Sequence, residues 1–294
     1  MSASLVMTEP RLQHVQCLGP RGLHRIAYWE WGDPGSRRVL VCAHGLARQG
    51  RDFDSLAMAM QSEFRVVCPD VAGRGESAWL PDPAGYQLPA YVADMVTLLA
   101  RLDADRLAWV GTSMGGLIGI GLAALPGSPI GRLVINDVGP TIDAAGIARI
   151  ADYVGLPLRW SSVDEAADYL LTISRGFGPH SREQWLALTR PMLREDDGLW
   201  RLHYDPAIAV PLRAVTAQAA AAGQAALWAA YDAIRCPTLV LRGVESDLLS
   251  KATVEAMRER GPRPAVHEFA GIGHAPTLVA AEQIAVVREF LLAA

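Results

Sequence analysis

The sequence of 294 residues is poor in cysteine, and its four cysteines are widely separated. They are Cys17, Cys42, Cys68 and Cys236, and no two of them form a C-x-x-C motif. The histidines are not clustered in the sequence either. This spacing argues against both a disulfide framework and a structural metal site. We therefore expect free thiols, buried in or beside strands, in a protein of a reducing compartment.

The sequence also lacks long basic runs and long apolar runs. Basic residues form no long run and the formal net charge is −4, which argues against a nucleic-acid partner. No stretch approaches the roughly 20 apolar residues that span a membrane, and residues 1–13 lack the basic and apolar segments of an export signal. We expect a cytoplasmic protein that acts on a small molecule, without a membrane partner, and we make no prediction of its oligomeric state.

Apolar, β-branched runs alternate along the chain with segments of helical periodicity. Residues 38–45 form a continuous apolar run that is typical of a buried strand, whereas residues 25–32 alternate like a half-exposed one. Between such runs, Phe53, Leu56 and Met60 lie on one helical stripe. The alternation predicts an α/β fold in which helices flank a mostly parallel sheet.

The alternation stops between residues 140 and 235. This segment contains helical stretches separated by Gly and Pro, and we expect no buried strand in it. We predict that residues 1–139 and 236–294 form the core, and that residues 140–235 form a helical cap over the carboxyl ends of the strands, where open α/β sheets bind ligands. The segment is rich in aromatic residues, which either line an apolar pocket or build the cap's own core: Tyr153, Trp160, Tyr169, Phe177, Trp185, Trp200, Tyr204, Trp228 and Tyr231.

A serine stands where a strand-like run changes into a helix-like one. Residues 111–115, Gly-Thr-Ser-Met-Gly, match the nucleophile elbow G-x-S-x-G. A sharp turn requires backbone angles that a Cβ resists, so a purely structural turn would use glycine, asparagine or aspartate at its apex. The flanking glycines allow the strand and the helix to approach each other closely. Ser113 is therefore the candidate nucleophile.

A serine hydroxyl needs a general base, and the base needs a carboxylate that orients it. His274 lies in a glycine-rich loop before the last helical stretch and is the candidate base. Asp247 follows the strand-like run 238–243 and is the preferred acid, because it gives the chain order Ser, Asp, His. Asp137, after the run 132–136, and Glu245, in the same loop as Asp247, are alternatives.

An oxyanion hole completes this chemistry with two backbone N–H donors. The residue after the nucleophile, Met114, is expected to supply one donor. Leu46, just past His44 and Gly45 at the end of a strand-like run, is expected to supply the other.

Taken in order, these segments resemble the alpha/beta-hydrolase-fold family over nearly the whole chain. They are the oxyanion segment 41–50, the P-D-x-x-G-x-G-x-S segment within 68–79, the elbow 110–119, the acid loop 239–250 and the histidine loop 271–278. The resemblance implies a sheet of about eight strands, a helical cap inserted after the sixth strand, and no cofactor or metal. It does not identify a substrate, because function resides in the site rather than in the fold.

The serine at the elbow narrows the chemistry further. Relatives that open epoxides or displace halide use aspartate there, so Ser113 favours a serine carboxylesterase acting on short- to medium-chain acyl or aryl esters, or on lactones. We expect Leu46 to crowd one side of the ester carbonyl. A carbon–carbon hydrolase of ring-cleavage products is the first alternative, since those relatives share the S-M-G-G of residues 113–116, although they usually carry asparagine where this chain has Thr112. A ligand receptor on the same fold is the second.

Overall fold

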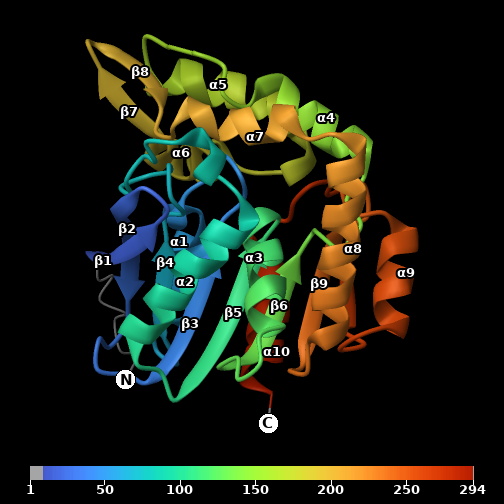
Figure 1. Cartoon of the computed structure of the whole chain (residues 1–294). Coiled ribbons are helices and arrows are strands. Elements are labelled where there is room, and N and C mark those ends of the chain that lie inside the picture. The colour runs from blue at the N-terminus through green and yellow to red at the C-terminus, as the bar shows by residue number, and fades with distance from the viewer. Residues whose placement is uncertain (1–8, 294) are drawn as a thin grey trace.

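The computed structural model describes residues 9–293, and an eight-stranded sheet forms its centre (Figure 1). Residues 1–8, part of the N-terminal stretch in which we find no export signal, lie outside the described residues. The strands are β1 (Arg11–Gly19), β2 (Gly22–Trp31), β3 (Arg38–Ala43), β4 (Arg65–Pro69), β5 (Arg106–Thr112), β6 (Ile130–Asn136), β9 (Thr238–Gly243) and β10 (Ala265–Phe269).

The strand order in this sheet is β1-β2-β4-β3-β5-β6-β9-β10. The pairs β1/β2 and β2/β4 are antiparallel, and the pairs from β4/β3 onward are parallel. Strands β3, β5, β6 and β9 are covered on both faces, which is why they read as continuous apolar runs. The α/β fold that the sequence predicts and the sheet of about eight strands that the resemblance implies are therefore confirmed.

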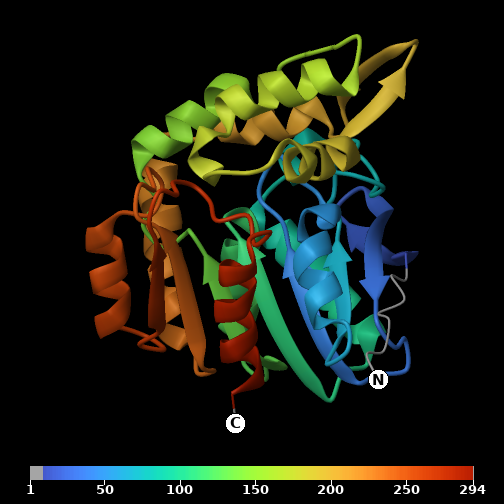
Figure 2. The same cartoon turned by 180° about the vertical axis from the view of Figure 1, so that it is seen from behind.

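Helices cover both faces of the sheet, and successive strand residues pack alternately against them. One face carries α2 (Leu88–Leu102), α3 (Met114–Ala123), α8 (Ala217–Ala233) and α9 (Lys251–Glu259) (Figure 1). The other carries α1 (Asp54–Met60) and α10 (Ala281–Leu292) (Figure 2). In β5, for example, Trp109 packs in the first core and Val110 in the second. No helix within residues 9–293 has the length and apolar character needed to cross a bilayer.

The segment after β6 lies over the carboxyl ends of the parallel strands (Figures 1 and 2). It contains α4 (Ala144–Tyr153), α5 (Val163–Ile173), α6 (Arg182–Thr189) and α7 (Ala209–Ala214), and a hairpin of β7 (Leu193–Asp196) and β8 (Leu199–Leu202). The expectation that this segment holds no buried strand did not foresee the hairpin. Its strands have four residues each, of which only Leu193 is buried, so they lack the buried apolar run that marks a core strand.

Helix α8 differs from the other helices between residues 140 and 235, because it packs along the sheet beside α3 (Figure 1). Its Tyr231 is fully buried and donates a hydrogen bond to the carbonyl of Met257 in α9 (3.1 Å). Trp228 donates its indole N–H to Thr141 Oγ1 (2.9 Å). The helices that overhang the sheet are thus α4 to α7. The division into a core and a cap at residues 140–235 stays a prediction.

Candidate active site

The elbow lies between β5 and α3, with Ser113 at its apex. Ser113 has φ = 52° and ψ = −116°, a conformation that is strained for a residue with a Cβ. Its N–H donates to the carbonyl of Asn136 in the neighbouring strand (2.9 Å), and its own carbonyl accepts from Gly116 (2.8 Å). The first turn of α3 and strand β6 therefore hold the strained serine in place.

The flanking glycines have the steric role that the motif predicts. A Cβ on Gly111 would lie 2.1 Å from the carbonyl oxygen of Gly115. A Cβ on Gly115 would lie 1.9 Å from the carbonyl oxygen of Ala43 in β3. Because both contacts are with backbone atoms, a larger residue at either position would push the helix away from the sheet.

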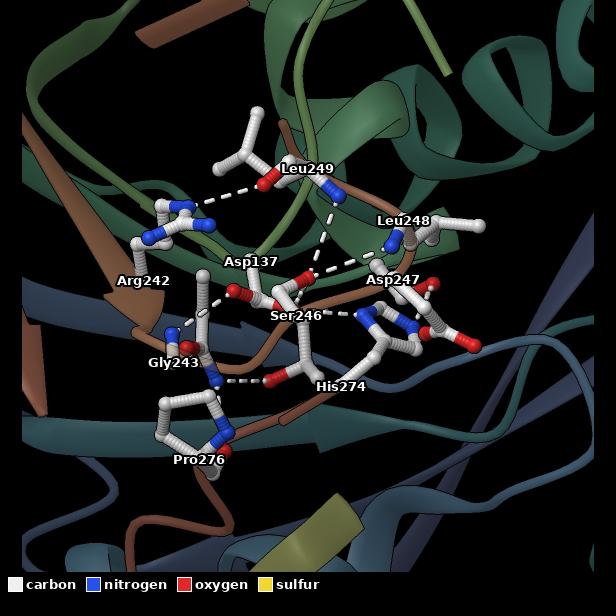
Figure 3. A network of polar contacts seen from close by, with 12 residues as sticks. Asp137, Arg242, Gly243, Ser246, Asp247, Leu248, Leu249, His274 and Pro276 are labelled. Atoms are coloured by element: carbon white, nitrogen blue, oxygen red, sulfur yellow. Dashed lines mark hydrogen bonds and ion pairs between the residues drawn. The ribbon is translucent and has the colours of Figure 1, made fainter. Parts of the chain in front are cut away.

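Ser113, His274 and Asp137 form a hydrogen-bonded relay at the carboxyl end of the sheet. His274 Nε2 lies 3.0 Å from Ser113 Oγ. His274 Nδ1 lies 2.7 Å from Asp137 Oδ2 (Figure 3). The Nδ1–H group donates to the carboxylate, which leaves Nε2 free to accept the proton of the serine hydroxyl. This is the arrangement that activates a serine as a nucleophile.

The carboxylate of Asp137 is fully buried and held by two further donors. Its Oδ1 accepts from the N–H of Gly243 (2.9 Å), and its Oδ2 accepts from Ser246 Oγ (2.7 Å) (Figure 3). Ser246 Oγ in turn accepts from the N–H groups of Leu248 (3.3 Å) and Leu249 (3.1 Å). The loop after β9 thus supplies the support for a carboxylate that comes from the end of β6.

The expectation that Asp247 contacts His274 is wrong. Asp247 is exposed and accepts two hydrogen bonds from Arg149, at 2.5 and 2.9 Å. The Arg149 guanidinium lowers the pKa of Asp247. Glu245 is exposed as well. The physical reason is the sheet order: β6 is the immediate neighbour of β5, so a residue that follows β6 lies beside the elbow, and Asp137 fills that place.

The loop after β3 packs against the elbow, as the predicted oxyanion hole requires. A Cβ on Gly45 would lie only 3.7 Å from Ser113 Cβ. Among the described residues, no hydrogen bond is donated by the N–H of Leu46 or of Met114, so both remain available to a substrate oxygen. The role of these two donors stays a prediction.

A buried arginine that sequence analysis missed supports this loop. Arg74 is fully buried, and its Nε donates to the carbonyl of Leu46 (2.8 Å). Its Nη1 donates to the carbonyl of Ala72 (2.6 Å) and to the hydroxyl of Tyr91 (2.9 Å). Arg74 lies within the P-D-x-x-G-x-G-x-S segment, but only its contacts reveal that it holds the Leu46 peptide.

Ser113 and His274 open into a largely apolar cavity beneath the helices that overhang the sheet. Its wall includes Leu46, from the loop after β3, and several apolar residues of the overhanging segment, among them Ile150, Leu170 and Phe177. Some aromatic residues of segment 140–235 fall into the two groups that the sequence left open, whereas Trp228 and Tyr231 pack with the core of the sheet. Tyr153, Phe177 and Tyr204 line the cavity; Trp160 and Trp185 are buried in the small cores of the cap.

One further cluster of metal-ligand side chains lies away from the elbow. Cys17, His24 and Asp94 bring one potential ligand atom each within 4.8 Å of one another, and His24 Nε2 lies 2.9 Å from Asp94 Oδ1. Burial raises the pKa of Cys17 to about 12. The protonated thiol is a poor metal ligand, so the cluster is best explained as a polar contact between His24 and Asp94 that joins β2 to α2.

His44, next to the oxyanion loop, is buried and neutral. Its Nε2 accepts from the N–H of Val71 (2.9 Å), and its Nδ1–H donates to the carbonyl of Gly45 (2.7 Å). Burial lowers its pKa to about 3. The imidazole therefore acts as a fixed bridge between the ends of β3 and β4.

We expect this bridge to make the fold acid-sensitive. The unfolded chain protonates His44 near pH 6.5, whereas the folded chain binds that proton only near pH 3, so stability falls as the pH decreases between these values. From pH 7 to pH 5 the loss due to His44 is about 2 kcal/mol. Urea unfolding at both pH values measures it. His44→Asn should remove that part of the pH dependence, and replacement of the exposed His267 by Gln should not; an equal effect of the two would contradict the assignment.

Comparison with known proteins agrees with this geometry. The model of the alpha/beta hydrolase family matches residues 40–287. A 3-hydroxybutyrate-oligomer hydrolase from Cupriavidus necator is 54% identical, and the alignment covers 100% of both chains. An alpha/beta hydrolase structure from Novosphingobium aromaticivorans superimposes with a TM-score of 0.85 at 34% identity, covering 97% of this chain and 99% of its own. An esterase from Mycobacterium tuberculosis is 26% identical over 85% of this chain and 80% of its own. The chain therefore belongs to the alpha/beta hydrolase family and is an ester hydrolase of that family.

Proposed function

We propose that this enzyme hydrolyses short oligomers of 3-hydroxybutyrate, and related short- to medium-chain esters, through an acyl-enzyme on Ser113. The observation that carries the proposal is the relay of Ser113, His274 and Asp137 at the base of an apolar cavity. The substrate class is supported by the relative from Cupriavidus necator, which is named for this activity and matches over the full length of both chains.

The first half of the reaction forms the acyl-enzyme. His274 Nε2 takes the proton of Ser113 as Oγ attacks the ester carbonyl carbon, and Asp137 stabilises the imidazolium that forms. The carbonyl oxygen becomes an oxyanion, which accepts from the N–H groups of Leu46 and Met114. When the tetrahedral intermediate collapses, the bond to the leaving oxygen breaks, and His274 gives its proton to that oxygen.

Water completes the cycle by the same steps. His274 takes a proton from a water molecule that attacks the acyl carbon, and the bond to Ser113 Oγ breaks as the serine regains its proton. The acid is released and the enzyme returns to its starting state. Because the apolar wall and the cap exclude bulk water, the charges of the two intermediates are stabilised by fixed dipoles rather than by solvent.

The cavity favours small acyl and alcohol groups. Leu46, next to the expected oxyanion donor, lines it, and cap residues close the opposite side. We expect esters of tertiary alcohols to be excluded by Leu46 and long acyl chains by the cap. We also propose a cytoplasmic location, because the widely separated cysteines fit a reducing compartment.

The experiment is a substrate panel on the purified enzyme. We expect release of 3-hydroxybutyrate from its dimer and trimer, with kcat/KM about 10-fold or more above that for an aryl ester of a sixteen-carbon acid. Chromatography measures the released acid, and Ser113→Ala is the blank. A dienoate ring-cleavage product tests the carbon–carbon hydrolase alternative. Cleavage of the dienoate with intact oligomers would contradict the proposal, and binding without turnover would favour a receptor.

A further inference from the structure

Two arginines line the cavity, Arg48 and Arg149, and none of the described residues in its lining is acidic. The guanidinium of Arg48 is occupied by hydrogen bonds within the protein. It donates to both carboxylate oxygens of Asp52 (2.6 and 2.8 Å) and to the carbonyl of Leu188 (3.3 Å). Only 13% of its side chain is exposed. Arg48 is therefore a neutralised structural group.

Arg149, on α4, is more exposed than Arg48 and is held less firmly by the protein. Its Nε and Nη2 donate to Asp247, and 39% of its side chain is exposed. Arg149 lines the cavity and Asp247 does not, so Asp247 binds the guanidinium from outside the cavity. A guanidinium has five N–H donors, and the bonds to Asp247 use two of them. An ion pair this exposed adds little stability, so a second carboxylate can share or replace it at small cost.

Tyr153 stands beside Arg149 at the same wall. It lies four residues further along α4, which places the two side chains on one face of the helix. The Arg149 guanidinium is close enough to act electrostatically on the Tyr153 phenol, and both residues line the cavity. Burial raises the pKa of Tyr153, so the phenol keeps its proton. A guanidinium next to a phenol presents the kind of donors that a carboxylate binds.

The position of this pair relative to His274 indicates which part of a substrate it meets. Asp247, the partner of Arg149, directly follows Ser246. The hydroxyl of Ser246 donates to the same Asp137 carboxylate oxygen that accepts from His274 Nδ1 (2.7 Å each). Arg149 thus lies on the His274 side of the site. Because His274 protonates the leaving oxygen, groups on this side contact the alcohol part of the ester.

We propose that Arg149, assisted by Tyr153, binds the free carboxylate of a hydroxy-acid oligomer at the leaving-group side, so that the enzyme removes units from the carboxyl end. This inference rests on the proposed function. In an oligomer of 3-hydroxybutyrate the terminal unit carries the carboxylate, and its 3-hydroxyl oxygen forms the ester. Ser113 Oγ bonds to the acyl carbon, the bond from that carbon to the 3-hydroxyl oxygen breaks, and this oxygen takes the proton from His274. One monomer leaves, and water releases the shortened oligomer with a new carboxylate.

The test compares the trimer as a free acid with its methyl ester. We expect Arg149→Met to lower the ratio of kcat/KM for the acid to that for the methyl ester by about 10- to 100-fold, mainly through KM, because one charge-assisted contact is lost. Tyr153→Phe should lower the ratio less. With a trimer labelled only in the carboxyl-terminal unit, the first monomer released should carry the label.

Two further variants distinguish a role of Arg149 in binding the substrate carboxylate from a purely structural role of its ion pair with Asp247. Asp247→Asn breaks the same ion pair but keeps the cation, so it should maintain or raise the ratio. Arg159→Met removes a cap arginine of similar exposure, paired with Asp196, and should leave the ratio unchanged. Equal losses of the ratio in Arg149→Met and Asp247→Asn, or parallel losses on both substrates, would overturn this inference alone. If the wild type cleaves neither substrate, both the proposed function and this inference are wrong.

Discussion

Ser113→Ala and His274→Ala are each expected to lower kcat by about 10⁴-fold or more. The reason is the 3.0 Å contact between Ser113 Oγ and His274 Nε2. Without Oγ no acyl-enzyme forms, and without the imidazole the hydroxyl keeps its proton and is a weak nucleophile. The measurement is the steady-state hydrolysis of a neutral aryl butyrate, which keeps carboxylate recognition out of the comparison.

The double variant makes this prediction sharper. Because the two residues act as a unit, Ser113→Ala combined with His274→Ala should be no slower than the slower single variant. Residual activity is then due to the oxyanion hole and to binding alone. His180→Ala, a cap histidine whose Nε2 contacts Thr277 (2.8 Å), is the matched control and should keep most of the activity. Turnover by Ser113→Ala at the wild-type rate would exclude the mechanism.

The α/β architecture could be predicted because each buried strand can be recognised from its own residues. A parallel strand covered on both faces must be apolar at successive positions, and β3, β5, β6 and β9 all are. The hairpin β7–β8 carries no such signal, since its strands have four residues each, only one of the eight is buried, and there is no clear alternation. The position of α8 was hidden for a different reason: helical periodicity indicates an apolar face but not the layer against which it packs.

The same distinction explains which contacts of the candidate site the sequence could indicate. Residues 111–115 indicate a tight strand-to-helix turn, because the glycines on both sides of Ser113 allow the two backbones to approach each other closely. His274 lies in a glycine-rich loop before the last helical stretch, which suits a general base. The carboxylate was ambiguous because Asp137 and Asp247 both follow strands and both precede His274 in the chain. Only the order of strands in space distinguishes them. The support from Ser246 was also invisible, because its hydroxyl bonds to Asp137 across 109 residues of sequence.

Asp137→Asn is expected to lower kcat by about 10³- to 10⁴-fold while the fold is kept. The amide oxygen can still accept from Gly243, so the NH₂ group must face His274 Nδ1 and Ser246. Nδ1 then becomes the acceptor and the proton moves to Nε2, which can no longer take the proton of Ser113. The imidazolium also loses its counter-charge in a buried site.

Asp247→Asn is the matched control. It makes the same chemical change at Asp247, the residue that the chain order Ser, Asp, His favours as the acid. On a neutral aryl ester its kcat should fall by less than about tenfold, since the side chain bonds to Arg149 rather than to His274. Circular dichroism and the melting temperature of each variant show whether the fold is kept. The reverse order of effects would assign the acid to Asp247. It would also require the histidine loop to move in the working enzyme, because in the structure His274 Nδ1 lies 2.7 Å from Asp137.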